Sequence, residues 1–157
     1  MDMPEPVERY WRDFQNSTGQ DLADRFYEAF HFDDNEADAD ALAQLVLTGR
    51  KCATASLLWT YEVQEKPLPF AGALSVVTDW RGNPMCIIES TVVDIVPFNE
   101  VSAEFAAIEG EGDHSLAFWR KVHWQYFGRE CQRLNKIATQ VMPVVCEQFK
   151  VVYRTAG

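Results

Sequence analysis

Apolar side chains recur at intervals of three and four residues in the first third of the chain. The first such run covers residues 7–14, behind two prolines, and predicts an amphipathic helix that ends near Gly19. Similar spacing predicts a second helix over residues 22–30. A third helix is predicted over residues 37–48, because acidic residues precede its start and Gly49 follows its end. The chain therefore begins with helices.

Downstream, the pattern changes to runs of β-forming residues. Four segments are typical of strands: residues 53–60, 73–79, 85–96 and 144–153. Arg-Gly-Asn at 81–83 predicts a hairpin turn between the second and the third of them. Helices are also predicted over residues 99–108 and 116–127, the latter capped by Asp113 or Ser115. This order predicts an α+β domain with a small mixed or antiparallel barrel at its centre, surrounded by helices.

Composition agrees with one folded domain in the cytoplasm. The chain has 157 residues, 47% of them hydrophobic, which suits a single domain with a real core. Its four cysteines lie far apart without a CxxC pair, which argues against a structural zinc site or a disulfide framework. The first residues lack the basic and apolar regions of a signal peptide, and no apolar stretch is long enough for a membrane span. We therefore expect a cytoplasmic protein with reduced thiols and no membrane partner.

The net charge indicates which classes of binding partner are disfavoured. Fourteen Lys and Arg against 24 Asp and Glu give −10, which disfavours long nucleic acids and leads us to expect no DNA partner. Residues 114–157 differ, because they hold 7 basic and 2 acidic residues. The basic residues of the predicted helix region are Arg120, Lys121, Arg129, Arg133 and Lys136. They form either a local basic face or the ordinary solvated side of a helix.

One short motif joins the third predicted helix to the first predicted strand. Gly49, Lys51 and Thr54 have the spacing of the GxKxxT signature of the ASCH domain, a small PUA-like β-barrel, and the chain resembles that family. Further segments resemble the longer bacterial ASCH proteins in the same order: residues 53–58, 86–91 and 109–116, then Trp119, Arg120 and His123, and finally residues 144–149. The resemblance therefore rests on several segments in addition to the motif.

This resemblance covers roughly residues 26–153. It implies an ASCH domain over residues 26–157, with residues 1–25 as a helical extension packed on it. The sequence departs from the family at one place. Many members carry Gly-Asp ahead of the second barrel strand, where this chain has Gly72 and Ala73. Any role of that carboxylate is therefore not carried over.

The resemblance implies a function directed at RNA or nucleosides. ASCH domains are thought to bind RNA or modified nucleosides. Some small members hydrolyse N4-acetylcytidine with a Lys, a Thr and a Glu, and ribonuclease activity is attributed to longer ones. Lys51 and Thr54 match the first two of these catalytic positions. Glu111 is the expected counterpart of the acid, and Glu109 and Glu89 stay open as alternatives.

The chemistry of this trio sets conditions on the fold. The Thr54 hydroxyl becomes a nucleophile only if a base removes its proton. Lys51 can be that base only if burial lowers its pKa from about 10.4 toward neutrality. On a regular strand the two side chains would point to opposite faces, so a turn or bulge is required, and Gly49 permits one. A nearby glutamate would orient the ammonium or pass a proton to the leaving group.

Further residues are predicted to bind the substrate: Gly49, Arg50, Glu89, Ser115, His123 and Trp124. Several of them have a structural alternative. Arg50, like Lys51, could offset the dipole of the preceding helix, Glu89 could face outward from a strand, and Ser115 suits a helix cap. Trp124 lies off the main apolar stripe and could stack on a base. His123 has no second histidine at metal-ligand spacing, so no metal site is predicted, and no cofactor is indicated.

Three functions stay open at this point. The chain is predicted to be an RNA- or nucleoside-directed ASCH protein, a hydrolase with ribonuclease-like action on single-stranded RNA. One alternative is an amidohydrolase on a modified nucleoside such as N4-acetylcytidine, which suits an acidic chain because a neutral substrate needs no phosphate-binding groove. The other is a non-catalytic module that binds RNA or nucleosides. RNA or a modified nucleoside is thus the predicted partner, and the sequence does not indicate the oligomeric state.

Overall fold

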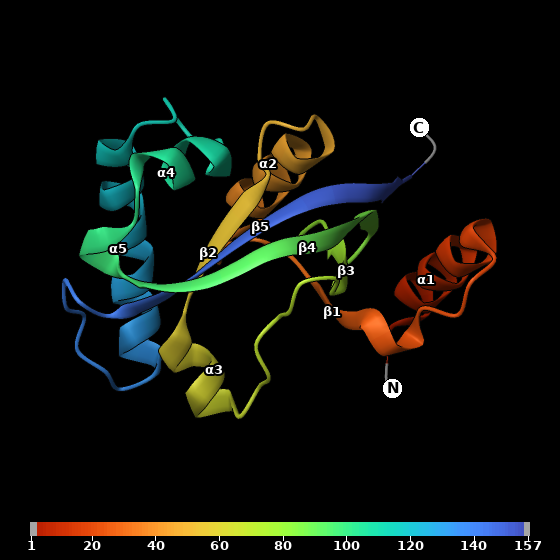
Figure 1. Cartoon of the computed structure of the whole chain (residues 1–157), viewed down its shortest axis with the longest axis horizontal. Coiled ribbons are helices and arrows are strands. Elements are labelled where there is room, and N and C mark those ends of the chain that lie inside the picture. Colours follow the sequence, from red (N-terminus) through yellow and green to blue (C-terminus); the bar gives the residue numbers. More distant parts are fainter. Residues whose placement is uncertain (1–2, 156–157) are drawn as a thin grey trace. The chain divides into compact units, whose positions relative to one another are not determined.

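The chain folds as an α+β protein in the computed structural model, which describes residues 3–155 (Figure 1). It forms two compact units, each built from segments that are distant in sequence. Unit 1 comprises the chain up to Gly49, residues 71–91 and the chain from Phe149 onward, and unit 2 comprises residues 50–70 and 92–148. The domain boundary expected after residue 25 stays a prediction.

One mixed sheet has the strand order β1-β3-β4-β5-β2. Its strands are β1 (Phe26–Phe30), β2 (Ala53–Leu57), β3 (Leu74–Thr78), β4 (Pro84–Pro97) and β5 (Pro143–Arg154). β1 is parallel to β3, whereas the pairs β3–β4 and β2–β5 are antiparallel. The sheet is open, with β1 and β2 at its ends, so the predicted closed barrel is wrong. Closure requires the two end strands to pair with each other, and here each end strand has five residues and a single neighbour.

Unit 1 buries apolar side chains on both faces of β3. Its helices are α1 (Glu5–Thr18) and α2 (Glu36–Leu47), with a 3-10 turn, η1 (Ala23–Arg25), between them. Trp11 of α1 belongs to a cluster with Val76, whereas Val46 of α2 belongs to a different cluster with Val77. Because consecutive strand residues point to opposite faces, α1 and α2 cover opposite sides of β3. This explains why every residue of β3 is buried.

Unit 2 has its own apolar core. Its helical elements are α3 (Leu58–Gln64), η2 (Phe98–Glu100), α4 (Ala103–Glu109) and α5 (Leu116–Arg133). Phe98, Trp119 and Phe127 form the core with inward-facing residues of β2 and β5. Ser115 accepts a hydrogen bond from the Phe118 N–H at 3.1 Å, so the predicted cap begins α5. Among the described residues, no helix has both the length and the apolar character needed to cross a bilayer.

Two parts of the predicted element order are wrong. Residues 22–30 form η1 and then β1 instead of a helix. Phe26 and Phe30 fit a strand period of two as well as helical spacing, and pairing of Phe26 with Leu74 of β3 decides for the strand. Residues 58–60, predicted as the end of a strand, instead begin α3. The remaining predicted helices and strands, and the hairpin between β3 and β4, are confirmed, although α4 begins later than predicted.

Ser115→Ala tests the cap of α5. We expect the free energy of unfolding to fall by about 1 kcal/mol, because the Phe118 N–H loses its acceptor. Urea denaturation measures the change. Ser115→Asp is the matched control and should stay within about 0.5 kcal/mol of wild type, since aspartate also caps helices. Equal stability of the alanine variant and wild type would contradict the assignment.

Candidate functional site

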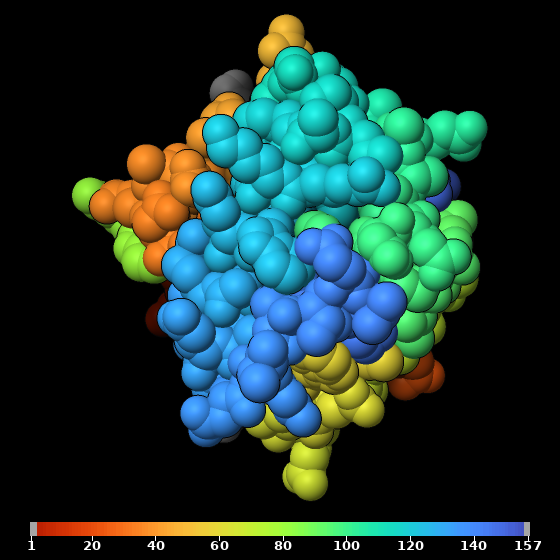
Figure 2. All heavy atoms as spheres, turned by 90° about the vertical axis from the view of Figure 1, so that its left-hand side faces the viewer, coloured from red at the N-terminus to blue at the C-terminus, as the bar shows by residue number. Residues whose placement is uncertain are grey.

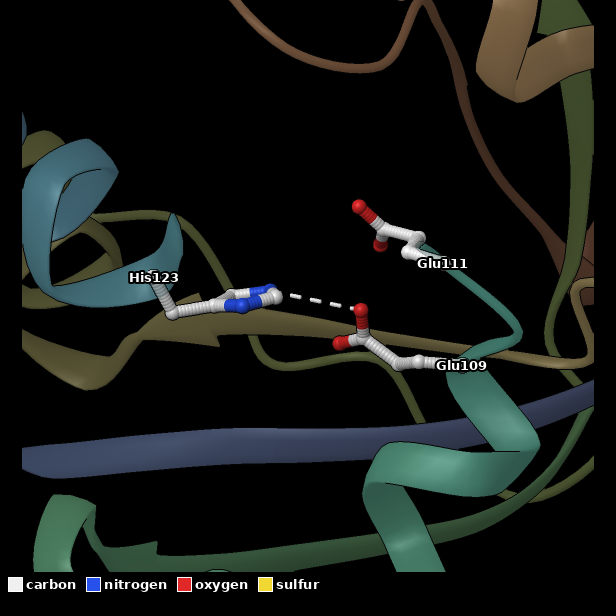
Figure 3. Close-up of side chains that lie close together, drawn as sticks. All are labelled: Glu109, Glu111 and His123. Atoms are coloured by element: carbon white, nitrogen blue, oxygen red, sulfur yellow. Dashed lines mark ion pairs between the residues drawn. The ribbon is translucent and has the colours of Figure 1, made fainter. Parts of the chain in front are cut away.

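Four ionisable side chains of unit 2 meet in one place, which we call the charge cluster: Lys51, Glu109, Glu111 and His123. Lys51 Nζ lies 2.9 Å from Glu111 Oε2 and 3.4 Å from Glu109 Oε2. It also donates a hydrogen bond to the Ala53 carbonyl at 2.8 Å. His123 Nε2 lies 3.2 Å from the same Glu109 oxygen. Figure 3 shows the imidazole pointing toward Glu109, with Glu111 on the segment that follows α4.

Backbone contacts between two segments create this arrangement. The Cys52 N–H donates to the Ile108 carbonyl at 3.0 Å, so the segment ahead of β2 runs beside the end of α4. Gly110 follows α4 with φ +71°, and a Cβ at this position would stand 1.8 Å from the Arg50 carbonyl oxygen. Glycine alone permits this approach. The carboxylates before and after Gly110 can therefore reach the same ammonium group.

His123 is held by its own helix. Its Nδ1 lies 2.9 Å from the Trp119 carbonyl oxygen, and its ring stacks on the Trp119 indole with centroids 4.2 Å apart. A carbonyl can only accept a hydrogen bond, so Nδ1 carries a proton while Nε2 faces a carboxylate. Burial alone would lower the pKa of His123, but Glu109 and Glu111 outweigh it and raise this pKa above its ordinary value. The imidazolium form is therefore favoured.

The most deeply buried members of the charge cluster stay ionised. Only 1% of each side chain is exposed for Lys51 and Glu109. Burial would lower the pKa of Lys51, but Glu109 and Glu111 reverse this effect and raise it. Burial would also raise the pKa of Glu109, but Lys51 and His123 hold it well below its usual range. Because Lys51 keeps its proton at neutral pH, the condition for its action as a base is not met.

Glu111 differs from the other members of the charge cluster in exposure and in proton affinity. Its side chain is 16% exposed, against 1% for Lys51. Burial and the adjacent Glu109 raise the pKa of Glu111 to about 7, although Lys51 acts in the opposite direction. A carboxyl group with a pKa near neutrality can both accept and release a proton at physiological pH. Glu111 is thus the member best suited to acid–base chemistry.

Three members of the charge cluster also have the donor atoms of a metal site. One ligand atom each of Glu109, Glu111 and His123 lies within 4.8 Å of the others. However, the Lys51 ammonium already bonds both carboxylates, and a second cation in the same space would be repelled by it. The donor set fits a divalent ion only if Lys51 moves away. The expectation of no metal stays a prediction.

Two residues predicted for the site are not members of the charge cluster. Thr54 pairs with Glu147 of β5, and strand alternation directs it away from the face on which Ala53 joins the core of unit 2. In the described part of the chain, the Thr54 hydroxyl has no hydrogen bond to the Lys51 ammonium. Glu89 belongs to unit 1, where it pairs with Arg25 at 3.3 Å. Their predicted roles therefore find no support in the arrangement of the charge cluster.

The other predicted residues have positions that their sequence context explains. Gly49 follows α2 with φ +80°, and Ser115 caps α5. Arg50 has an exposed side chain, while its carbonyl oxygen abuts Gly110. Trp124 is 37% exposed on α5 and packs against Phe98 with ring centroids 5.5 Å apart. Of these four, none belongs to the charge cluster.

Sequence reasoning left Glu109 as an alternative and missed two residues that position the cluster. Gly110 stands between two glutamates in a Glu-Gly-Glu-Gly run, a spacing that indicates two carboxylates around a tight turn. Trp119 precedes His123 by four residues, so a helix places the two rings on one face. The Glu-Gly-Glu-Gly run and the spacing of Trp119 and His123 are both visible in the sequence. They indicate a site only once the segment that contains Lys51 is known to lie beside the end of α4.

The fold and the charge cluster define an α+β protein with a cluster of paired, largely buried ionisable side chains. A model of the ASCH domain matches residues 28–153, and the chain belongs to the ASCH domain family. It is similar to the crystal structure of an ASCH domain from Lactobacillus crispatus JV V101, with 38% identity, 98% of each chain covered and a TM-score of 0.91. A crystallised protein of Enterococcus faecalis V583 is 33% identical, with a TM-score of 0.89 over 97% of this chain and 91% of its own.

A more distant likeness concerns the fold alone. The crystal structure of a hypothetical protein has 13% identity and a TM-score of 0.52 over 81% of this chain and 98% of its own. No curated protein matches the chain. The ASCH family is linked to RNA binding and nucleic-acid processing, and this is the functional class to which the membership points.

Gly110→Ala tests whether the turn builds the charge cluster. We expect the variant to lose about 3 kcal/mol of stability or more, because its Cβ would overlap the Arg50 carbonyl oxygen and its φ is positive. Thermal and urea unfolding measure the loss. Gly128→Ala is the matched control: it lies in α5 with nothing within 4 Å of an added Cβ, and should gain about 0.5–1 kcal/mol. Similar stabilities for the two variants would refute this account of the turn.

Titration of the carboxyl groups by NMR tests the electrostatics. The Glu111 resonance should titrate near pH 7, whereas Glu109 should stay ionised far below its ordinary pKa. Glu111 binds its proton more tightly in the folded state than at the ordinary value of 4.5, so its contribution to stability should fall between pH 4.5 and about 7. Glu111→Gln should lack this decrease. A Glu111 resonance that titrates near 4.5 would contradict the assignment.

Proposed function

We propose that the chain is an RNA- or nucleoside-directed hydrolase in which Glu111 is the general base and the Lys51 ammonium stabilises developing negative charge. The observation that carries the proposal is Glu111 itself: a partly exposed carboxyl group with a pKa of about 7, held 2.9 Å from a buried cation. Membership in a family linked to nucleic-acid processing supports the choice of substrate class.

The charges of the cluster suit hydrolysis. The ammonium of Lys51, the imidazolium of His123 and the carboxylate of Glu109 leave one positive charge, which ionised Glu111 balances. When Glu111 accepts a proton from the attacking oxygen, the net positive charge returns as the substrate becomes more negative. Fixed charges in a site largely shielded from water stabilise this developing negative charge on the substrate most strongly.

For a ribonuclease, Glu111 would remove the proton of a ribose 2′-hydroxyl. The 2′-oxygen then attacks the adjacent phosphorus, and the bond to the 5′-oxygen breaks. That oxygen leaves with a proton returned from Glu111 or from water, which yields a 2′,3′-cyclic phosphate and a free 5′-hydroxyl. The strand must be single-stranded, because the in-line geometry of this attack is not available in a duplex. Lys51 would stabilise the additional charge on the phosphoryl oxygens.

The second candidate is hydrolysis of N4-acetylcytidine. The net charge of −10 favours it, because a neutral nucleoside is not repelled by the protein. Glu111 would take a proton from water, and the hydroxide would attack the acetyl carbonyl. The C–N bond would then break as Glu111 returns the proton to the leaving nitrogen, which gives acetate and cytidine. In this route a water replaces Thr54 as the nucleophile, since Lys51 is protonated and Thr54 has no hydrogen bond to it.

Glu111→Gln tests both candidates. We expect kcat/KM on single-stranded RNA, or on N4-acetylcytidine, to fall at least about 100-fold, because the amide cannot accept a proton. In wild type the rate should rise as pH increases through about 7, where Glu111 loses its proton. Gel analysis of labelled RNA and chromatography of the nucleoside measure the two activities.

The matched control is Glu104→Gln, which changes an exposed glutamate in the first turn of α4. It should keep wild-type activity. Retention of activity by the Glu111 variant would refute the catalytic assignment. Absence of turnover of both substrates by wild type, at enzyme concentrations comparable to substrate, would remove the hydrolase proposal and leave RNA or nucleoside binding.

A further inference from the structure

The exposed side of α5 has a charge opposite to that of the protein as a whole. From Leu116 to Arg129 the helix contains three basic residues and no acidic one. The first acidic residue, Glu130, is only partly exposed and lies 3.4 Å from Arg133. Figure 2 shows this side of the molecule, where the segments coloured cyan to blue cover much of the visible surface. A polyanion repelled by the protein elsewhere would be attracted here.

Four residues on this side of α5 form what we call the Trp124 surface: Arg120, Lys121, Trp124 and Gly128. They are spaced at i−4, i−3, i and i+4 relative to the tryptophan, so helical geometry makes them neighbours. Both cations are exposed, and Trp124 is 37% exposed. The combination of an exposed indole with two cations one turn away distinguishes this surface from an ordinary solvated helix face.

The Trp124 ring has a fixed position and open space beside it. Its centroid lies 5.5 Å from that of buried Phe98, which supports the ring from within unit 2. One turn later, Gly128 has no side chain, and an added Cβ there would meet nothing within 4 Å. Arg120 is ordered too, because it donates a hydrogen bond to the Asn99 carbonyl at 3.3 Å. The open position at Gly128 therefore leaves room one turn beyond the partly exposed indole.

We infer that the Trp124 surface binds a single-stranded polynucleotide, with one unpaired base stacked on Trp124 and the adjacent phosphates near Arg120 and Lys121. The inference takes the RNA substrate of the proposed function as its starting point, and concerns how the strand is held outside the charge cluster. Aromatic side chains that alternate with cations suit this ligand, because every base has a face that stacks and every nucleotide carries a phosphate.

The same features disfavour other polyanions. An acidic peptide would pair with the cations but would leave the indole without a stacking partner. A duplex keeps its bases stacked within the helix, and the overall charge of −10 repels its dense phosphates. The strand is therefore recognised by one base face and a short run of phosphates.

Binding is tested by fluorescence anisotropy with a labelled oligouridylate of about 12 nucleotides. The measurement is made in a Glu111→Gln background, so that the strand stays intact. Trp124→Ala should weaken binding about tenfold, because one base loses its stacking partner. Lys121→Gln should lower the slope of log K against log salt by about 0.7, the value for one phosphate of a single strand.

Two matched controls belong to unit 1. Trp80→Ala removes a tryptophan that is 38% exposed, and Lys150→Gln removes an exposed lysine. Both should bind as the background protein does. Circular dichroism and the melting temperature establish that each variant is folded, and Lys121→Gln tests the inference independently if Trp124→Ala proves unstable.

The inference is overturned if the background protein does not bind the oligonucleotide, or if Trp124→Ala and Lys121→Gln bind as the controls do. Equal competition by polyglutamate of matched charge would also overturn it, because that result describes a general polyanion site. Binding that depends on Trp124 without any hydrolysis would refute the proposed function alone, whereas hydrolysis with an unchanged KM in Trp124→Ala would refute the Trp124 surface alone.

Discussion

The buried ammonium of Lys51 is the constraint around which unit 2 is built. An isolated charge in a protein interior is highly unfavourable, so the fold must supply partners for it. Three partners bond it: the nearby Ala53 carbonyl at the start of β2, and the distant Glu109 at the end of α4 and Glu111 in the segment that follows. Glu109 in turn bonds His123 of α5. One cation thus links the first strand of the unit to two of its helices.

This arrangement divides proton affinity unequally between two glutamates. Glu109 lies between Lys51 and His123, and their positive charges keep it ionised despite complete burial. Glu111 bonds Lys51, but burial and its side-chain hydrogen bond to ionised Glu109 favour the protonated form, so its proton is held more tightly. Pairs of carboxyl groups with separated pKa values are typical of sites in which one group transfers a proton and the other stays ionised. The same logic gives Lys51 the role of a fixed cation instead of a base.

Glycine at position 110 shows how a backbone feature can decide the chemistry of a site. It ends α4 and allows the chain to touch the Arg50 carbonyl. Any side chain at position 110 would move Glu109 and Glu111 away from the Lys51 ammonium, even though the charged residues themselves would be unchanged. The helix cap at Ser115 has a comparable role for α5. It fixes the residue at which the helix begins, and thereby the position of His123 along it.

Hydrophobic spacing and local signals in the sequence were enough to predict α1, α2, α5, the hairpin of β3 and β4, and the α+β class, because these depend on contacts between near neighbours. The family resemblance, and Lys51 as its central residue, could also be read from the sequence. The strand identity of residues 26–30, the open sheet and the absence of Thr54 and Glu89 from the charge cluster could not. Each depends on which distant segment lies alongside: β3 beside β1, β5 beside β2, and the end of α4 beside Lys51.

Tertiary structure also decided the ionisation of the site. The pKa of Lys51, for example, is set by its burial and by the charges of Glu109 and Glu111, which are 58 and 60 residues away in the chain.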